Sequence, residues 1–94
     1  TVTNFLDLAI HGKNLDLQME ELLIPKNSPL AGKNLIESDI RPNYNLIVIA
    51  IQKSSGKMYF NPQPVSEIEA GDTLVVVGKR ENLDLMQREN SISS

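Results

Sequence analysis

The chain has 94 residues, 40% of them hydrophobic, and a formal net charge of −3, which fits one small domain and argues against a deep catalytic cleft. The lack of cysteine excludes disulfide bonds and thiolate metal sites. Acidic and basic residues are interspersed and only two Phe and two Tyr are present, so the chain lacks the basic surface of a nucleic-acid-binding protein and we expect no nucleic-acid partner.

The first segment has the periodicity of a helix. Its apolar residues, Phe5, Leu6, Ala9 and Ile10, form a helical stripe. Gly12 follows as a C-terminal stop. We therefore expect residues 1–12 to be the end of a linking helix.

Alternating apolar and polar residues predict a strand that begins at Leu15. Leu22 lies out of phase with Met19, so a continuous strand would send these two side chains to opposite faces. We expect a bulge or a change of strand partner near Glu20 and Glu21.

Gly32 and Lys33 suggest a phosphate-binding loop at first sight. That motif requires a glycine five residues before Gly32 and a Ser or Thr after the lysine, but Asn27 and Asn34 stand at these positions. We interpret Gly32 as a turn residue with a permissive backbone and Lys33 as a solvated residue that starts a helix.

That helix is expected to be short. Leu35, Ile36 and Ile40 recur at helical spacing. Pro42 disfavours a helical conformation at Arg41, so the helix should end there.

The remainder predicts three strands and a closing helix. Residues 46–51 read as a central buried strand, with far fewer apolar residues than the ~20 that span a bilayer. The other expected elements are a hairpin turn at 53–56, a partner strand at 57–61 broken by prolines at 62 and 64, a tight turn at 69–72, a strand at 73–78 and a helix at 80–88. Fraying is expected from Asn90, with 91–94 as a disordered tail.

Few residues offer catalytic or metal chemistry. His11 is the only histidine, which excludes a multi-histidine metal site and leaves no nucleophile–base pair, so we expect no enzyme activity. Asp16 and Glu20 share a strand face and could hold a hard cation, although solvated carboxylates are the simpler interpretation. Asp39 and Arg41 could form a local ion pair or hold a planar anionic ligand.

Two blocks of the chain carry a resemblance. They are ELLIPKNSPLAGKNLIESDIRPNYNLIVIAI at 21–51 and GKMYFNPQPVSEIEAGDTLVVVGKRENL at 56–83. Together they resemble the TrkA-C domain, the C-terminal subdomain of the RCK regulators of potassium conductance. The shared pattern is P-x-x-S-P-L-x-G-K-x-L, then D-[IL]-R, an apolar strand, a hairpin ending near prolines, and E-x-G-D-x-L-V-V-x-G.

The resemblance implies an α+β fold, a small sandwich-like domain over residues 13–90 with a β-sheet and short helices. It implies a homodimer at the cytoplasmic face of the membrane that regulates a potassium channel or transporter without catalysis. Pairing also suits so small a domain, because it removes apolar surface from water. A ligand-free dimerisation scaffold and the same module on a non-potassium carrier remain alternatives.

The resemblance also implies a ligand site in the groove between two copies. In some members this groove binds cyclic di-AMP, and in others another small regulatory ligand. The matching positions are Leu35, Ile36, Asp39, Arg41, Asn43 and Ile47. Ile47 replaces an asparagine of the dinucleotide-binding members. The G-x-G-x-x-G turn of the companion subdomain does not occur in this chain, so we assign it no NAD or adenosine nucleotide site.

Overall fold

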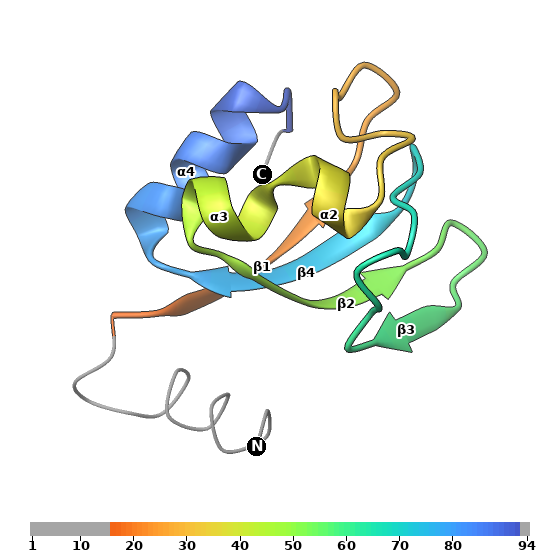
Figure 1. The fold of residues 1–94 in the computed structure, drawn as a ribbon, viewed down its shortest axis with the longest axis horizontal. Helices are drawn as coiled ribbons and strands as arrows, with labels where there is room; N and C mark the ends of the chain where they lie inside the picture. The colour runs from red at the N-terminus through yellow and green to blue at the C-terminus, as the bar shows by residue number, and fades with distance from the viewer. Residues whose placement is uncertain (1–15, 93–94) are drawn as a thin grey trace.

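The structure is a computed structural model that describes residues 16–92. The helix expected at 1–12 and His11 lie outside these residues. The described elements are β1 (Gln18–Leu23), α2 (Leu35–Ser38), α3 (Ile40–Tyr44), β2 (Ile47–Gln52), β3 (Met58–Phe60), β4 (Thr73–Gly78) and α4 (Arg80–Glu89). The three helices lie together on one side of the sheet (Figure 1).

The four strands form one antiparallel sheet in the order β1-β4-β2-β3. β4 lies between β1 and β2, and its residues from Leu74 to Gly78 are buried. Both predicted turns are present, with Gly56 and Gly71 at φ +96° and +92°, where a side chain would strain the backbone. This architecture confirms the predicted α+β class.

The main core lies between the sheet and the helices. Its fully buried apolar residues include Leu22, Ile40, Leu46, Leu74, Val76, Leu83 and Met86. A second, smaller cluster contains Ile49, Ala50, Val75 and Val77. Adjacent strand residues alternate between these clusters because successive side chains point to opposite faces of a sheet.

β1 corrects one prediction. Its pairing with β4 runs without interruption from Gln18 opposite Gly78 to Leu23 opposite Thr73, so the bulge expected near Glu20 and Glu21 is wrong. Met19 and Leu22 therefore belong to one strand and point to its opposite faces. Leu22 lies in the core, and Met19 is 41% exposed on the other face. The register shifts instead in β2, between Val48 and Ala50.

The short helix is also longer than predicted, and it is divided in two. Asp39 adopts a left-handed conformation, φ 53°, and separates α2 from α3. Pro42 lies within α3 and does not end a helix at Arg41. A proline is accepted in the first turn because those backbone N–H groups have no partner within the helix.

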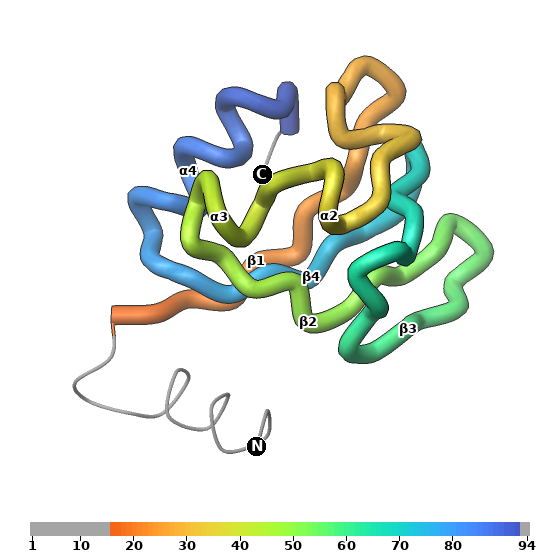
Figure 2. The backbone as a smooth tube through the Cα atoms, viewed as in Figure 1, coloured from red at the N-terminus to blue at the C-terminus, as the bar shows by residue number. Residues whose placement is uncertain are grey.

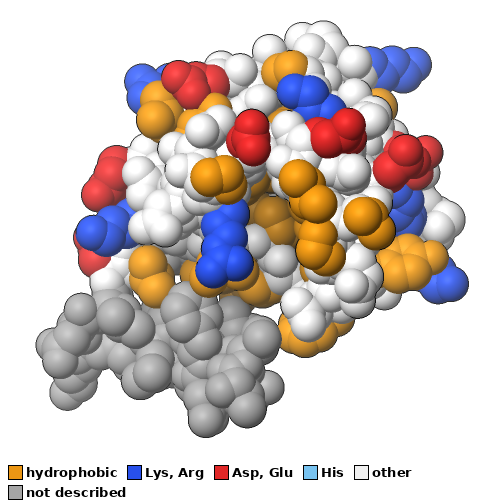
Figure 3. All heavy atoms as spheres, viewed as in Figure 1, with side chains coloured by type: hydrophobic (Ala, Val, Ile, Leu, Met, Phe, Trp, Pro, Cys, Tyr) orange, Lys and Arg blue, Asp and Glu red, His pale blue; other side chains and the backbone are white. Residues whose placement is uncertain are grey.

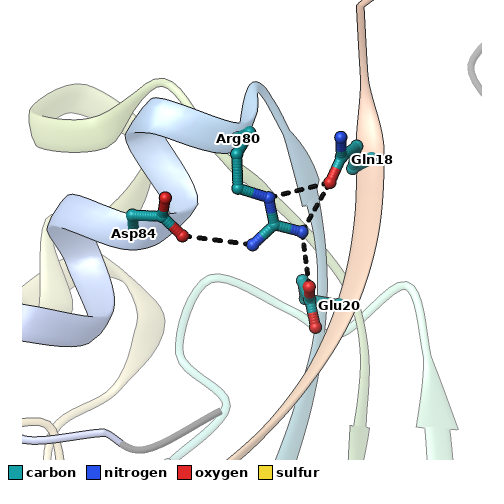
Figure 4. Close-up of polar contacts among 4 residues, drawn as sticks. All are labelled: Gln18, Glu20, Arg80 and Asp84. Atoms are coloured by element: carbon teal, nitrogen blue, oxygen red, sulfur yellow. Dashed lines mark hydrogen bonds and ion pairs between the residues drawn. The ribbon is translucent and has the colours of Figure 1, made fainter.

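α4 is fastened to β1 by Arg80. Its guanidinium donates to the side-chain oxygen of Gln18, forms an ion pair with Glu20 and bonds Asp84 at 3.2 Å (Figure 4). Glu20 is therefore an ion-pair partner, and the residues that the structure describes include no group of three or more His, Cys, Asp or Glu side chains placed to hold a metal ion.

The end of α4 is packed, which corrects the expected fraying from Asn90. The Asn90 side chain donates to the Met86 carbonyl at 2.9 Å, and the Ile92 N–H donates to the Gln87 carbonyl at 2.9 Å. Asn90 and Ile92 are 7% and 6% exposed, because both side chains find partners that the local pattern does not reveal.

Candidate functional site

The main hollow lies between α2, α3, the start of β2 and the segment after β3, and has a volume of about 470 Å³. Its lining residues are Leu35, Ile36, Ser38, Asp39, Ile40, Arg41, Pro42, Leu46, Ile47, Val48, Asn61, Pro62 and Pro64. Apolar side chains gather in the middle of the face shown in Figure 3, with acidic and basic side chains beside them. A hollow with apolar walls and a few polar groups is the usual form of a small-molecule site.

Hydrogen bonds join the segment after β3 to the start of α2. The Ile36 N–H donates to the Pro64 carbonyl at 3.2 Å, and the Leu35 N–H donates to the Ser66 carbonyl at 3.2 Å. The first N–H groups of a helix have no acceptor within the helix, and these two carbonyls act as their acceptors. This is why two stretches far apart in sequence run side by side at the hollow (Figure 2).

The start of α2 is also fixed by its own side chains. The Asn34 side-chain oxygen accepts from the Glu37 N–H at 2.8 Å, and the Glu37 carboxylate accepts from the Asn34 N–H at 2.9 Å. This reciprocal capping box stabilises a helix of only four residues. It thereby holds Leu35 and Ile36 at the wall of the hollow.

The hollow rests on Leu46, which is fully buried. Gly78 in β4 leaves the space for this side chain, since a Cβ at Gly78 would overlap with Leu46 Cδ2. Any larger residue at position 78 would therefore displace the Leu46 side chain.

Asp39 and Arg41 provide the charges at the hollow. Both are exposed, and no salt bridge joins them within residues 16–92, so the local ion pair considered from the sequence is not formed. Arg41 also borders a second hollow of about 230 Å³, beside Leu17 and Val77. An exposed guanidinium next to apolar walls can bind an anionic, planar group through paired hydrogen bonds and stacking.

Five of the six predicted site residues line the main hollow: Leu35, Ile36, Asp39, Arg41 and Ile47. Asn43 is not among the lining residues. Its N–H donates to the Asp39 carbonyl within α3, and it lies roughly 200° around the helix from Arg41. This rotation directs it away from the hollow.

Three further residues line the hollow that the sequence pattern did not predict: Asn61, Pro62 and Pro64. The sequence signals these residues only through the two prolines, which are predicted to break the preceding strand. Their partnership with α2 arises from hydrogen bonds across more than twenty residues of chain, as between Ile36 and Pro64, and local pattern does not encode such contacts.

Within residues 16–92, no helix is long and apolar enough to cross a membrane. Ile36 and Ile47, at the hollow, are 61% and 42% exposed. These two side chains could pack against the faces of a flat ligand, with Arg41 facing an anionic part of it.

Comparison with known proteins gives consistent matches. KhtT, a K⁺/H⁺ antiporter subunit of Bacillus subtilis (strain 168), is 41% identical over 68 residues, 72% of this chain, and the chain spans 41% of its length. The RCK C domain of the potassium transport protein KtrA, solved with cyclic di-AMP, is 28% identical with a TM-score of 0.75, covering 93% of each chain.

A third relative extends the comparison. The RCK_C domain dimer of S. agalactiae BusR, solved with cyclic di-AMP, is 27% identical with a TM-score of 0.71 and covers 79% of this chain and 90% of its own. BusR has also been solved with promoter DNA, in a chain of which this one covers 44%. The expectation of no nucleic-acid partner is therefore not supported by these relatives.

The family comparison agrees with the fold and with the two sequence blocks. The TrkA-C domain model matches residues 19–90, from β1 to the end of α4. This range contains every lining residue of the main hollow. The chain belongs to the TrkA-C domain family.

Proposed function

We propose that this chain is a regulatory, ligand-sensing and dimerising domain that controls a potassium channel or transporter from the cytoplasmic face of the membrane, without catalysis. Membership of the TrkA-C family and similarity to a K⁺/H⁺ antiporter subunit and to a potassium transport protein support this. The regulatory unit spans residues 13–90, and residues 1–12 link it to the transport machinery.

The observation that carries the ligand-sensing role is the hollow that joins apolar walls to Arg41. Its ligand is cyclic di-AMP or another small, flat, anionic regulator, bound by Leu35, Ile36, Asp39, Arg41 and Ile47. The solved complexes of KtrA and BusR with cyclic di-AMP support this ligand class. The role of Asn43 would be indirect, through α3.

Regulation requires two arrangements of the paired domains. A ligand in the groove between two copies shifts their equilibrium only by its differential affinity for the two arrangements. The linking segment then passes the preferred arrangement to the membrane protein. A ligand-free scaffold would show the same dimer with no such shift, and a non-potassium carrier would show the same shift with a different cargo.

Calorimetric titration of cyclic di-AMP into the chain tests this proposal. Arg41→Ala should weaken binding by about tenfold or more, because a charge-assisted hydrogen bond contributes on the order of 1.5–3 kcal/mol. Lys33→Ala removes the same charge from an exposed residue outside the hollow and should leave binding unchanged.

Sedimentation of the same proteins separates sensing from scaffolding. We expect the Arg41→Ala dimer to remain intact while its ligand response is lost. Absence of heat with the wild-type chain would reject cyclic di-AMP as the ligand. Equal weakening by Arg41→Ala and Lys33→Ala would show that the hollow is not the binding site.

A further inference from the structure

The sheet has a second apolar face, on the side away from the three helices. Ile49, Ala50, Val75 and Val77 form the cluster on this face and are between 2% and 8% exposed. Met19 lies opposite Val77 in the register of β1 and β4, and directly paired residues share a face, so the apolar surface continues onto β1. An apolar sheet face is stable only when another element covers it.

The described helices cannot cover this face. α2, α3 and α4 all lie on the other side of the sheet (Figure 1). Among residues 16–92, Leu17 is the one partly buried apolar side chain that packs against the cluster. Burial this deep at the centre of a sheet requires a further covering segment.

The chain enters the sheet beside this cluster. β1 begins at Gln18, opposite Gly78, and Leu17 comes directly before it. Residues 1–15 precede this point in the sequence, so they join the sheet at one end of the face that needs a cover. The second hollow, lined in part by Leu17 and Val77, lies at the same end.

We propose that residues 1–12 dock on the second face of the sheet through their apolar stripe, Phe5, Leu6, Ala9 and Ile10. At about 100° per residue, these four side chains fall within an arc of about 140° on a helix, and Leu8 lies outside it. The stripe contains no charged residue, so it can enter an apolar interface without leaving a charge unpaired.

The lengths of the two partners match. A helix over residues 1–12 is about 18 Å long, and a strand of six residues such as β4 spans about 17–20 Å. Residues 13–16 reach about 13 Å when extended, which is enough to turn the helix back across the strands. The docked stripe therefore covers β4 and β2 along their length.

This inference deepens the proposed linking role of residues 1–12, and its functional meaning rests on that role. A docked segment belongs to the folded unit and lies beside the second hollow, which shares Arg41 with the candidate ligand site. The link to the membrane protein then starts from the sheet and not from a free tether.

Nuclear Overhauser contacts in the full chain test the docking directly. The methyl groups of Val75 and Val77 should show contacts to the ring of Phe5. The chain has two phenylalanines, and the second is Phe60. Contacts that vanish in Phe5→Leu and persist in Phe60→Leu therefore belong to Phe5. Absence of contacts between Phe5 and either valine would overturn the proposal.

The same experiment identifies which copy supplies the cover. In a mixture of isotope-labelled and unlabelled chains, filtering selects contacts between copies. We expect the Phe5 contacts to arise within one chain and to be absent from the filtered spectrum. Contacts that appear only between copies would assign the face to a second chain and would overturn docking within the chain.

Ile10→Asp and Leu8→Asp provide a matched pair. Both place a carboxylate in the same segment, but only Ile10 belongs to the stripe. Ile10→Asp should lower the urea midpoint of unfolding by about 1 M, because a buried isoleucine contributes strongly to so small a domain. Leu8→Asp should leave the midpoint nearly unchanged. Equal shifts in the two variants would overturn the assignment of the stripe.

Calorimetric titration with cyclic di-AMP separates this inference from the proposed function. Phe5 contacts in a chain that gives no heat would support the docked segment and reject the ligand. Heat in a chain without Phe5 contacts would keep the ligand site and reject the docking.

Discussion

Lys53 holds a buried carboxylate in the turn before β4. Its Nζ lies 2.6 Å from Asp72 Oδ2 and 2.7 Å from Glu69 Oε1. Asp72 is 1% exposed and also accepts the Glu69 N–H at 2.8 Å. Burial alone lowers the pKa of Lys53, but the hydrogen bonds to Asp72 and Glu69 outweigh it and raise the pKa overall.

Lys53→Met should lower the free energy of unfolding by about 2–3 kcal/mol, because it leaves the buried Asp72 carboxylate without its cation. Urea unfolding at neutral pH measures this loss. Lys33→Met, at an exposed position, is the control and should change stability little. Equal effects of the two substitutions would show that the ion pair contributes nothing specific.

The same pair predicts a loss of stability in alkali. A raised pKa in the folded state means that the stabilisation is fully present below the ordinary lysine pKa of 10.5 and is lost as pH rises through the folded value. Burial and a hydrogen bond to Glu89 raise the pKa of Tyr44 as well, so it acts in the same direction. Unfolding at increasing pH should therefore show a steeper decline in wild type than in Lys53→Met.

At the residue scale, the sequence predicted which side chains lie together where chemistry and family pattern coincide. Leu35, Ile36 and Arg41 follow from the motif, and all three line the hollow. Asn43 was named because it lies two residues after Arg41 in the family pattern, and the structure places it in α3, outside the lining of the hollow. The role of Pro64 depended on a tertiary hydrogen bond that no local pattern specifies.

At the element scale, the strands were predictable because apolar runs and turn residues bound them clearly. The helices were harder. Pro42 can end a helix or lie in the first turn of one. Because α3 begins directly after the left-handed Asp39, Pro42 lies in the first turn of α3. The bulge of β2 was equally hidden, since Ile47 to Ile51 are apolar in both phases.

α2 depends on its capping box, which gives a direct prediction. Asn34→Ala should cost about 1 kcal/mol of unfolding free energy, because the Glu37 N–H loses its acceptor. It should also weaken ligand binding, since α2 carries Leu35 and Ile36, which line the hollow. Asn34→Asp keeps an acceptor at the same place and should retain most of the stability in urea unfolding. A stable Asn34→Ala chain would show that the bonds to Pro64 and Ser66 suffice to hold α2.

At the scale of the whole molecule, strand order could not be read from the sequence. β1 and β4 are distant in the chain yet pair over their full length, so β4 joins β2 as an inner strand of the sheet. Such long-range pairing depends on burying apolar side chains on both faces of the sheet, which residues far apart in the chain achieve together. The result leaves β1 and β3 as the two edges.

If two copies pair, thermal stability must depend on protein concentration. Dimerisation stabilises the folded state by mass action, so Tm should rise as the chain concentration increases. Scanning calorimetry over a hundredfold concentration range would show this. A constant Tm in wild type would contradict pairing over that range.

Arg41 lines both hollows, so the position of its side chain affects the volume of each. A ligand that drew the guanidinium further into the larger hollow would enlarge the smaller one. The smaller hollow lies beside Leu17, immediately before β1, where the chain enters the sheet. Substitution of this one arginine would therefore change the walls of both hollows at once.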